Sequence, residues 1–313
     1  MNNTKRLREG FLVSFLYLLL LMLTIFIPGI ELLTLFILPI PFVYFASRFG
    51  WKIALVPFFF TLIISIAFIP LLSIPFTILS GLGGIMIGGS VYRGVTAYET
   101  WARGSAGFLV GLLFVFVFIQ WILDVNLVDE MKKAMEESIK TTQVMLEGFG
   151  LNATPDQMVL IEEQVFRVLN LLPVIMAATA MTIGFVTQWI SYKILNWFTK
   201  QSLRFPPFRE YHLPKAMVWI YFITIILSMF DTEPTSSLYI GTTNVMHLAG
   251  ILLTLQGLAF VFYYTHVKGV SKVVPIITTV LTFVFPFIGL YLMRILGIID
   301  LGFSLRQRVT EKK

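Results

Sequence analysis

The sequence contains no cysteine. Disulfide bonds, thiolate metal sites and cysteine nucleophiles are therefore excluded. Histidine is nearly as scarce, and the three residues, His212, His247 and His266, are too widely spaced to form a zinc signature. Charged residues make up only 13% of the chain, whereas a soluble domain carries about 25%. These shortages exclude cysteine chemistry, leave no zinc signature and argue against a soluble fold.

Hydrophobic residues, in contrast, make up 57% of the 313 residues. A soluble fold of this length could not bury so much Leu, Ile, Phe and Val, whereas a bilayer can surround it. The net charge of +6 does not indicate a nucleic-acid partner, because Lys and Arg occur in short clusters between apolar runs, where they determine membrane topology. We therefore expect an integral membrane protein whose main partner is the lipid bilayer.

Nine apolar runs approach the length of a membrane-crossing helix, which needs roughly 20 predominantly apolar residues. They cover residues 10–27, 31–47, 52–70, 73–91, 104–123, 168–191, 215–230, 243–265 and 273–298. The pattern predicts an all-α, polytopic transmembrane helical bundle of eight or nine segments. Pro28-Gly29 predicts a tight hairpin between the first two runs, and Pro39 and Pro41 predict a kink in the second.

The N-terminus combines basic residues with an apolar stretch from Phe11 to Ile27, as a secretory signal does. No small-residue cleavage site follows, and Pro28-Gly29 leads directly into the next apolar run. We therefore expect an uncleaved first span.

Lys and Arg are distributed unequally between the two sides of the predicted bundle. With a cytoplasmic N-terminus, fourteen basic residues up to Lys272 lie on the cytoplasmic side and four on the opposite side. Such a bias is the one described by the positive-inside rule. The sequence therefore predicts a multi-pass protein of the cell membrane with its N-terminus in the cytoplasm.

The last apolar run, residues 273–298, leaves alternatives open. Simple alternation would place the basic tail after it, from Arg306 to Lys313, outside the cell. Pro275 and Pro286 divide the run, which favours a re-entrant hairpin or a short span followed by an interfacial helix. We favour a cytoplasmic tail because of its positive charge, with a complete ninth crossing as the alternative.

A polar insert, residues 124–166, holds nine acidic residues against three lysines. Apolar residues spaced three or four apart from Val128 to Phe149 predict a helix that Gly148 and Gly150 end. Thr154-Pro155-Asp156-Gln157 predicts the start of a second helix, which continues into the sixth span with a kink near Pro173. The hairpin is either a solvated cap or a lid or docking surface.

These features predict three regions. Residues 1–123 form a first transmembrane bundle of five spans, residues 124–166 an acidic extracytoplasmic helical hairpin, and residues 167–313 a second transmembrane bundle with a basic tail.

Motifs for catalysis are missing from the sequence. The segment from Gly83 to Ser90 has glycines like those of a phosphate-binding loop, but it lacks the lysine that must reach the phosphates and lies in an apolar run. Neither a His-Glu-x-x-His motif nor a Gly-x-Ser-x-Gly elbow occurs. We therefore expect no enzymatic activity and no cofactor, so that active transport would need another subunit or an ion gradient.

Small residues four apart predict close helix packing, because small side chains let two helix backbones approach in lipid. We expect this packing to lie inside the bundle, with a contact between subunits as the alternative. The residues are Ser80, Gly84, Gly88, Gly107, Gly111, Ala180 and Gly184.

Polar residues near the predicted outer ends of the spans are candidate ligand-binding residues, because amide and ionisable groups at membrane depth are costly. They either line an outward-facing cavity or are hydrated and hydrogen-bonded between helices. Gln188 and Gln256 lie nearer the inner half and are expected to join helices. The cavity candidates are Gln120, Asp124, Asn170, Asn244 and His247.

Two segments on the predicted cytoplasmic side combine basic and aromatic residues, the loop 206–214 and the tail 300–308. Both suit either contact with a membrane or cytoplasmic partner subunit or anchoring to lipid headgroups.

Three segments resemble the YybS-like family of bacterial membrane proteins, which carry a domain of unknown function. They are the opening Arg8-Glu9-Gly10-Phe11-Leu12-Val13-Ser14-Phe15-Leu16-Tyr17, the loop Pro206-Pro207-Phe208 with Leu213-Pro214, and the ending Leu296-Gly297-Ile298-Ile299-Asp300 with Arg306. The first five spans are also similar to the substrate-binding S components of energy-coupling-factor vitamin transporters. That similarity implies that Gly10 and Ser14 contact a coupling subunit, although alanines are more usual there. The acidic insert and the extra C-terminal spans depart from a six-helix S component.

The sequence therefore favours an S-component-like protein that binds a small molecule or lipid in its bundle, for binding or uptake, without an ATPase of its own. The alternative is a non-transport scaffold or regulatory protein that acts through the acidic hairpin and the basic loops. The sequence identifies no particular ligand.

Overall fold

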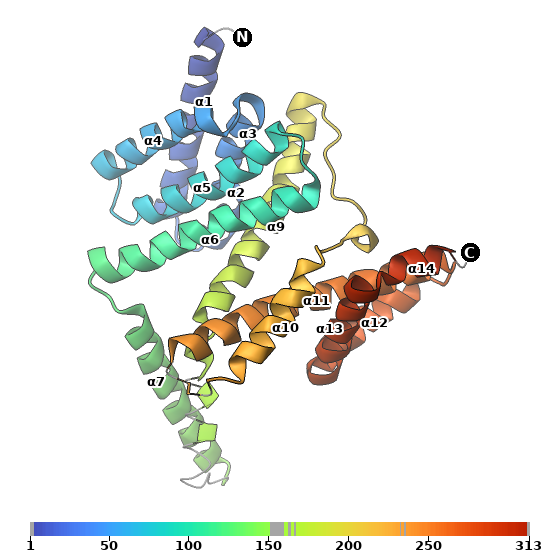
Figure 1. Ribbon diagram of the computed structural model, residues 1–313. Coiled ribbons are helices and arrows are strands. Elements are labelled where there is room, and N and C mark those ends of the chain that lie inside the picture. Colours follow the sequence, from blue (N-terminus) through green and yellow to red (C-terminus); the bar gives the residue numbers. More distant parts are fainter. Residues whose placement is uncertain are drawn as a thin grey trace. The chain divides into compact units, whose positions relative to one another are not determined.

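The computed structural model describes residues 3–150, 160–161, 164–165, 167–231, 233–234 and 236–311. Every regular element within these residues is a helix (Figure 1), which confirms the predicted all-α class. The helices are α1 (Asn3–Phe26), α2 (Glu31–Ile37), α3 (Ile40–Phe49), α4 (Trp51–Phe68), α5 (Ser73–Tyr92), α6 (Ala97–Ile122), α7 (Leu127–Gly148), α9 (Leu172–Thr199), the 3₁₀ turn η1 (Phe208–Glu210), α10 (Ala216–Ser228), α11 (Ser237–Val267), α12 (Val273–Val284), α13 (Pro286–Phe303) and α14 (Leu305–Glu311).

Eight helical stretches in the described part of the chain are long and apolar enough to cross a membrane. One of them, Glu31–Phe49, combines α2 and α3. The finding confirms a multi-pass helical membrane protein. Two further apolar helices, α10 with 13 residues and α12 with 12, fall below the roughly 17 residues that a crossing needs. The run at 215–230 is therefore helical but shorter than the sequence predicted.

Proline and glycine set the first helix boundaries where they were predicted. α1 ends at Phe26, and Gly29 adopts a φ of +91°, which favours glycine. The Gly29 N–H donates to the Glu31 carboxylate at 2.9 Å, which closes the turn. The second apolar run is interrupted between α2 and α3, with Pro39 as the N-cap of α3. The hairpin and the break in the second run are both confirmed.

The described helices form two compact units. The first contains residues 1–162 and 175–205, and the second contains residues 163–174 and 206–313. α7 belongs to the first unit, as does α9 from Ile175 onward. The three regions expected from the sequence differ from these two units and stay a prediction.

The first unit packs α1, α3, α4 and α5 around a core of aromatic and aliphatic side chains. Val13, Tyr17 and Leu21 follow at intervals of four, so that one face of α1 is buried in this core. Phe11 and Phe15 on another face are 64% and 60% exposed, as expected for side chains that contact lipid. The Tyr17 hydroxyl donates to Thr77 Oγ1 at 3.0 Å, so this buried polar group has a partner on α5.

Small residues lie where helix backbones approach each other in the first unit. A Cβ added to Gly84 would come within 2.6 Å of the Pro39 carbonyl oxygen, and one added to Gly88 would overlap the Val43 carbonyl oxygen. Both contacts join α5 to α3. Gly107 and Gly111 bring α6 onto α5, and Gly184 brings α9 onto Ser105 of α6. Ser80 and Ala180 are buried in the same unit.

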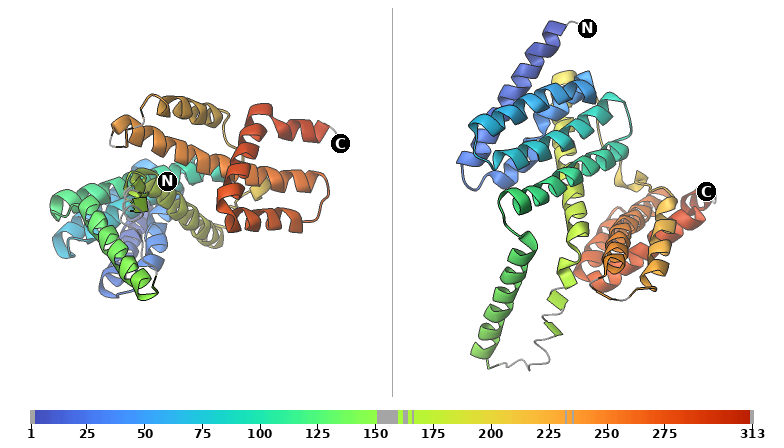
Figure 2. Two further views of the ribbon diagram at one scale, coloured as in Figure 1. Left: turned by 90° about the horizontal axis from the view of Figure 1, so that it is seen from below. Right: turned by 60° about the vertical axis from the view of Figure 1, so that its left-hand side comes forward.

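The second unit is built around α11. Figure 2 shows α13 crossing α11, and this is the most extensive helix contact of the unit. Gly257 and Gly297 lie at the crossing, because a Cβ on Gly257 would overlap the Met293 carbonyl oxygen and a Cβ on Gly297 would overlap the Leu253 carbonyl oxygen. The two backbones therefore touch, as small residues allow in lipid.

The last apolar run is two helices rather than one continuous crossing. α12 ends at Val284, and Pro286 occupies the first position of α13, where a missing N–H has no cost. Gly289 lies against the backbone of Thr282, so the two helices stay in contact after the break. Of the two, α13 meets the length and hydropathy of a crossing helix.

The acidic insert begins with α7, which is capped by Asn126. The Asn126 side chain accepts from the Val128 and Asp129 N–H groups at 3.1 and 3.2 Å. α7 ends at Gly148, and Gly150 has a φ of +75°, as predicted from the two glycines. The capping box at 154–157 lies outside the described residues. A turn at Asn170 and Leu171 precedes α9, close to the predicted kink at Pro173.

Candidate functional site

The structure brings two of the predicted cavity residues, Asn170 and Asn244, together through hydrogen bonds between the Asn244 side chain and backbone groups. Asn244 on α11 is 7% exposed, and its Oδ1 accepts from the Val174 N–H at 2.9 Å. Its Nδ2 donates to the Asn170 and Ile240 carbonyl oxygens at 2.6 and 2.8 Å. The amide therefore ties the start of α9 to α11.

The remaining candidates have different surroundings. The Asn170 side chain donates to the Pro234 carbonyl at 3.0 Å, and the exposed His247 ring lies 2.7 Å from the Thr243 carbonyl oxygen. Gln120 and Asp124 belong to the first unit, whereas Asn170, Asn244 and His247 belong to the second. Asp124 is exposed after the end of α6 with a φ of +54°. Their role as a ligand cavity stays a prediction.

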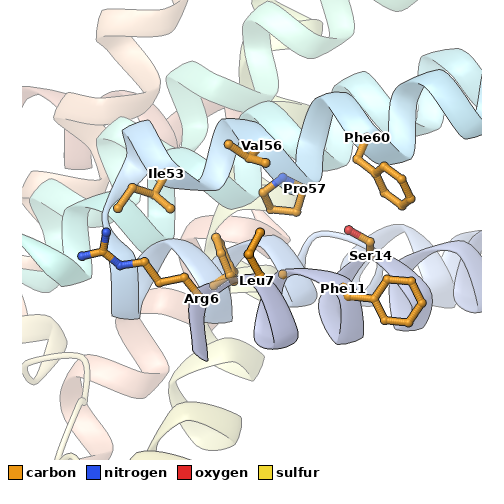
Figure 3. A pocket seen from close by; sticks show the side chains of 10 residues that line it. Arg6, Leu7, Phe11, Ser14, Ile53, Val56, Pro57 and Phe60 are labelled. Carbon is orange, nitrogen blue, oxygen red and sulfur yellow. The ribbon is translucent and has the colours of Figure 1, made fainter. Parts of the chain in front are cut away.

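A groove in the first unit provides a different candidate site. It has a volume of about 450 Å³ and lies between α1 and α4, with Phe45 of α3 contributing to its lining. Figure 3 shows Leu7 and Phe11 on one side and Ile53, Val56, Pro57 and Phe60 on the other. Pockets of small molecules commonly have volumes of about 300–1,000 Å³. The groove is therefore large enough to hold part of a ligand.

Two residues give this groove polar character. Ser14 is 1% exposed, and Arg6 lies at one end of the labelled set in Figure 3. The Arg6 Nε is buried and has no hydrogen-bond partner, although a guanidinium has five donors to satisfy. The groove therefore combines an apolar wall with one cationic end.

Gly10 and Ser14, the predicted contacts with a partner helix, both line the groove. A Cβ added to Gly10 would lie 3.6 Å from the Phe45 ring, which is ordinary van der Waals contact. Because Ser14 is buried within the unit, the outward face of α1 consists of larger side chains such as Phe15. The role of both residues toward a coupling subunit stays a prediction.

An ion pair lies beside the groove. Arg48 Nη1 lies 2.7 Å from Glu9 Oε2 and also donates to the Tyr44 hydroxyl at 2.6 Å. Glu9 is only 8% exposed, whereas the Arg48 side chain is 31% exposed, so the carboxylate is buried and its partner remains partly in contact with solvent. The pair connects the start of α1 to the end of α3.

A second polar cluster lies in the second unit around Asp300, whose side chain is fully buried. Arg306 Nε and Gln256 Nε2 both donate to Asp300 Oδ2, at 3.0 and 2.6 Å. Arg306 also donates to the Arg209 and Tyr211 carbonyl oxygens, each at 2.9 Å. Arg306 of α14 thus holds the loop around η1, and Asp300 of α13 links Arg306 to Gln256 of α11.

Gln256 and His212 complete this cluster. Gln256 Oε1 accepts from the Leu213 N–H at 2.9 Å, and its Nε2 lies 3.3 Å from His212 Nδ1. Partial burial and the Arg306 guanidinium lower the pKa of His212, and Asp300 only partly opposes them. The lowered pKa favours the neutral imidazole of His212 at pH 7.

The comparisons with known proteins agree with this architecture. The family model for a predicted membrane protein (DUF2232) matches residues 15–301. The chain belongs to the DUF2232 family. The Uncharacterized protein YybS of Bacillus subtilis (strain 168) is 27% identical over 312 residues, which cover 99% of this chain and 100% of that protein. These matches confirm the resemblance to the YybS-like family. No solved structure matches the chain.

This DUF2232 protein contains two charged residues that the sequence reasoning did not single out as site residues. Asp300 appeared only in the tail 300–308 and in the ending that resembles the YybS-like family, and Arg294 lies in the middle of α13. The Arg294 guanidinium packs against Gly250, and its Nη1 lies 3.3 Å from the Tyr221 hydroxyl. The sequence signal that could have identified both residues is a charge within an apolar run. Such residues usually face the bundle interior and have partners there.

Proposed function

We propose that this DUF2232 protein binds an amphipathic, lipid-like molecule in the groove between α1 and α4. The observation that carries the proposal is the combination of an apolar wall with a single cationic end in one groove. Leu7, Phe11, Val56 and Phe60 would contact a hydrocarbon chain, and Arg6 would contact an anionic group. The unused Nε donor of Arg6 supports this assignment, because a buried donor without a partner is costly.

The proposed activity is binding, or uptake that depends on another source of energy, rather than catalysis. We also propose that the N-terminus and the C-terminal tail are cytoplasmic, as the distribution of Lys and Arg supports. In that orientation Arg6 lies near the cytoplasmic surface. An anionic headgroup would therefore reach it without leaving the interface.

Gly10→Leu tests the groove directly. The new side chain would enter the groove, while a Cβ at this position makes only ordinary contact with Phe45. We expect at least about tenfold less co-purifying lipid in native mass spectrometry, since filling the site removes contacts worth about 1.4 kcal/mol or more. Gly241→Leu is the matched control, because nothing lies within 4 Å of Gly241 on α11.

Arg6→Gln tests the contact with the anionic group separately from the contacts with the hydrocarbon chain. We expect this variant to lose anionic lipids selectively and to retain neutral ones, because only the cationic end changes. If Gly10→Leu and Arg6→Gln both retain the wild-type set of lipids, the groove is not a binding site. The scaffold function would then be the better account.

A further inference from the structure

A second pocket, of about 490 Å³, lies in the second unit where α11 ends and α12 begins. Its walls come from three segments: the loop at η1, the last turns of α11, and the turn leading into the first residues of α12. None of these residues belongs to the groove of the first unit. The pocket is therefore a separate place in the molecule.

The charges that line this pocket are of one sign. Arg209 and Lys272 contribute to its lining together with the His266 imidazole, and no Asp or Glu does so among the described residues. No described carboxylate lies within ion-pair distance of any of these three side chains. An uncompensated group of basic side chains around a pocket attracts an anion.

The end of α11 does not cancel this positive character. The last carbonyl oxygens of a helix carry partial negative charge when they are free. Here the Tyr264, Thr265 and His266 carbonyl oxygens accept from the N–H groups of Lys268, Val270 and Gly269, at 3.0, 2.9 and 3.3 Å. These carbonyls are thus occupied within the turn, and the N-terminus of α12 adds partial positive charge beside the pocket.

Aromatic and aliphatic side chains form the rest of the pocket. Phe208 packs edge-on against Phe262, with their ring centroids 5.6 Å apart, and Ile276 of α12 completes the apolar part. A ligand that fits this lining has an anionic group attached to an apolar body. Inorganic anions alone would leave the apolar part without a contact.

The loop at η1, which carries Arg209, is held by hydrogen bonds to its backbone. Arg306 donates to the Arg209 and Tyr211 carbonyl oxygens and is itself paired with the buried Asp300. These bonds fix the loop backbone from which the Arg209 side chain extends, so binding an anion needs no further ordering of that backbone. Such preorganisation lowers the entropic cost of binding.

We infer that this pocket binds a phosphate group that is attached to an apolar body. The phosphate contacts Arg209, Lys272 and His266, and the apolar body contacts Phe208, Phe262 and Ile276. Both an anionic phospholipid and a soluble organic phosphate carry this chemistry. Basic side chains recognise phosphate through charge-assisted hydrogen bonds, which are stronger than neutral ones.

The test uses the full chain in phosphatidylcholine nanodiscs with two probes. One is phosphatidylglycerol added to the nanodisc, and the other is phenyl phosphate added to the solution. Arg209→Gln/Lys272→Gln is expected to weaken binding of one or both probes at least about tenfold. Lys215→Gln/Lys268→Gln is the matched control, because it removes the same charge from nearby exposed residues outside the pocket.

A second variant tests shape rather than charge. Ile276→Trp keeps all three basic residues and fills the apolar part from an exposed position, so it should weaken binding by a similar factor. Loss of phosphatidylglycerol alone identifies the ligand as a lipid headgroup, and loss of phenyl phosphate alone identifies a soluble organic phosphate. Equal losses in the pocket and control double variants, or no loss in either, would overturn the inference.

Discussion

Gly297→Leu is expected to destabilise the second unit by about 3 kcal/mol or more, because overpacking at a close helix contact costs about 1–3 kcal/mol and backbone atoms have little room to relax. At this position even a Cβ would overlap the Leu253 carbonyl oxygen, and a leucine side chain is larger still. α13 would have to move away from α11. The measurement is thermal unfolding of the purified protein in mild detergent.

Gly302→Leu is the control for this prediction. Gly302 lies on the same helix, but nothing lies within 4 Å of a Cβ added there. Both variants make the same exchange in α13, so they share the gain in helix propensity that leucine has over glycine. Similar melting temperatures for the two variants would show that α13 does not cross α11 at Gly297.

Asp300→Leu is expected to cost about 3–5 kcal/mol, the usual result of removing one member of a buried ion pair. The side chain of Asp300 is 0% exposed and that of Arg306 is 14% exposed. Without the carboxylate, Arg306 Nε and one Gln256 donor lose their acceptor. Unfolding in denaturant, read out as a loss of helical circular dichroism, measures this cost.

A double-mutant cycle completes this experiment. Asp300→Leu/Arg306→Met removes both charges and is expected to recover much of the lost stability, because the uncompensated guanidinium is gone. Glu99→Gln provides the contrast, since the Glu99–Arg103 pair on α6 is exposed and such pairs contribute about 0.2–1 kcal/mol. If Asp300→Leu is no more harmful than Glu99→Gln, the cluster does not hold the loop.

The membrane-spanning helices were predictable because their signal is local. Each apolar run is read from about 20 adjacent residues, and Pro28-Gly29 and Pro39 mark boundaries within the same short windows. The same signal overestimated the run at 215–230. Apolar composition continues beyond the helix there, and α10 is only 13 residues long.

The site features were less predictable because they depend on contacts between distant residues. Gln256 and Asp300 are 44 residues apart, and the groove needs the register of α1 against α4. The sequence placed Asn170 and Asn244 among several polar residues near the predicted outer ends of the spans, without pairing them. It could not show that backbone groups would occupy the Asn244 amide.

We propose that the apolar helices cross the bilayer with α7 on the outer side. Because the chain has no cysteine, single cysteines introduced at Lys140 and Ser202 report accessibility without background. We expect Lys140→Cys to react with a membrane-impermeant maleimide in intact cells, and Ser202→Cys to react only after permeabilisation. Protection of Lys140→Cys in intact cells, together with labelling of Ser202→Cys, would contradict it.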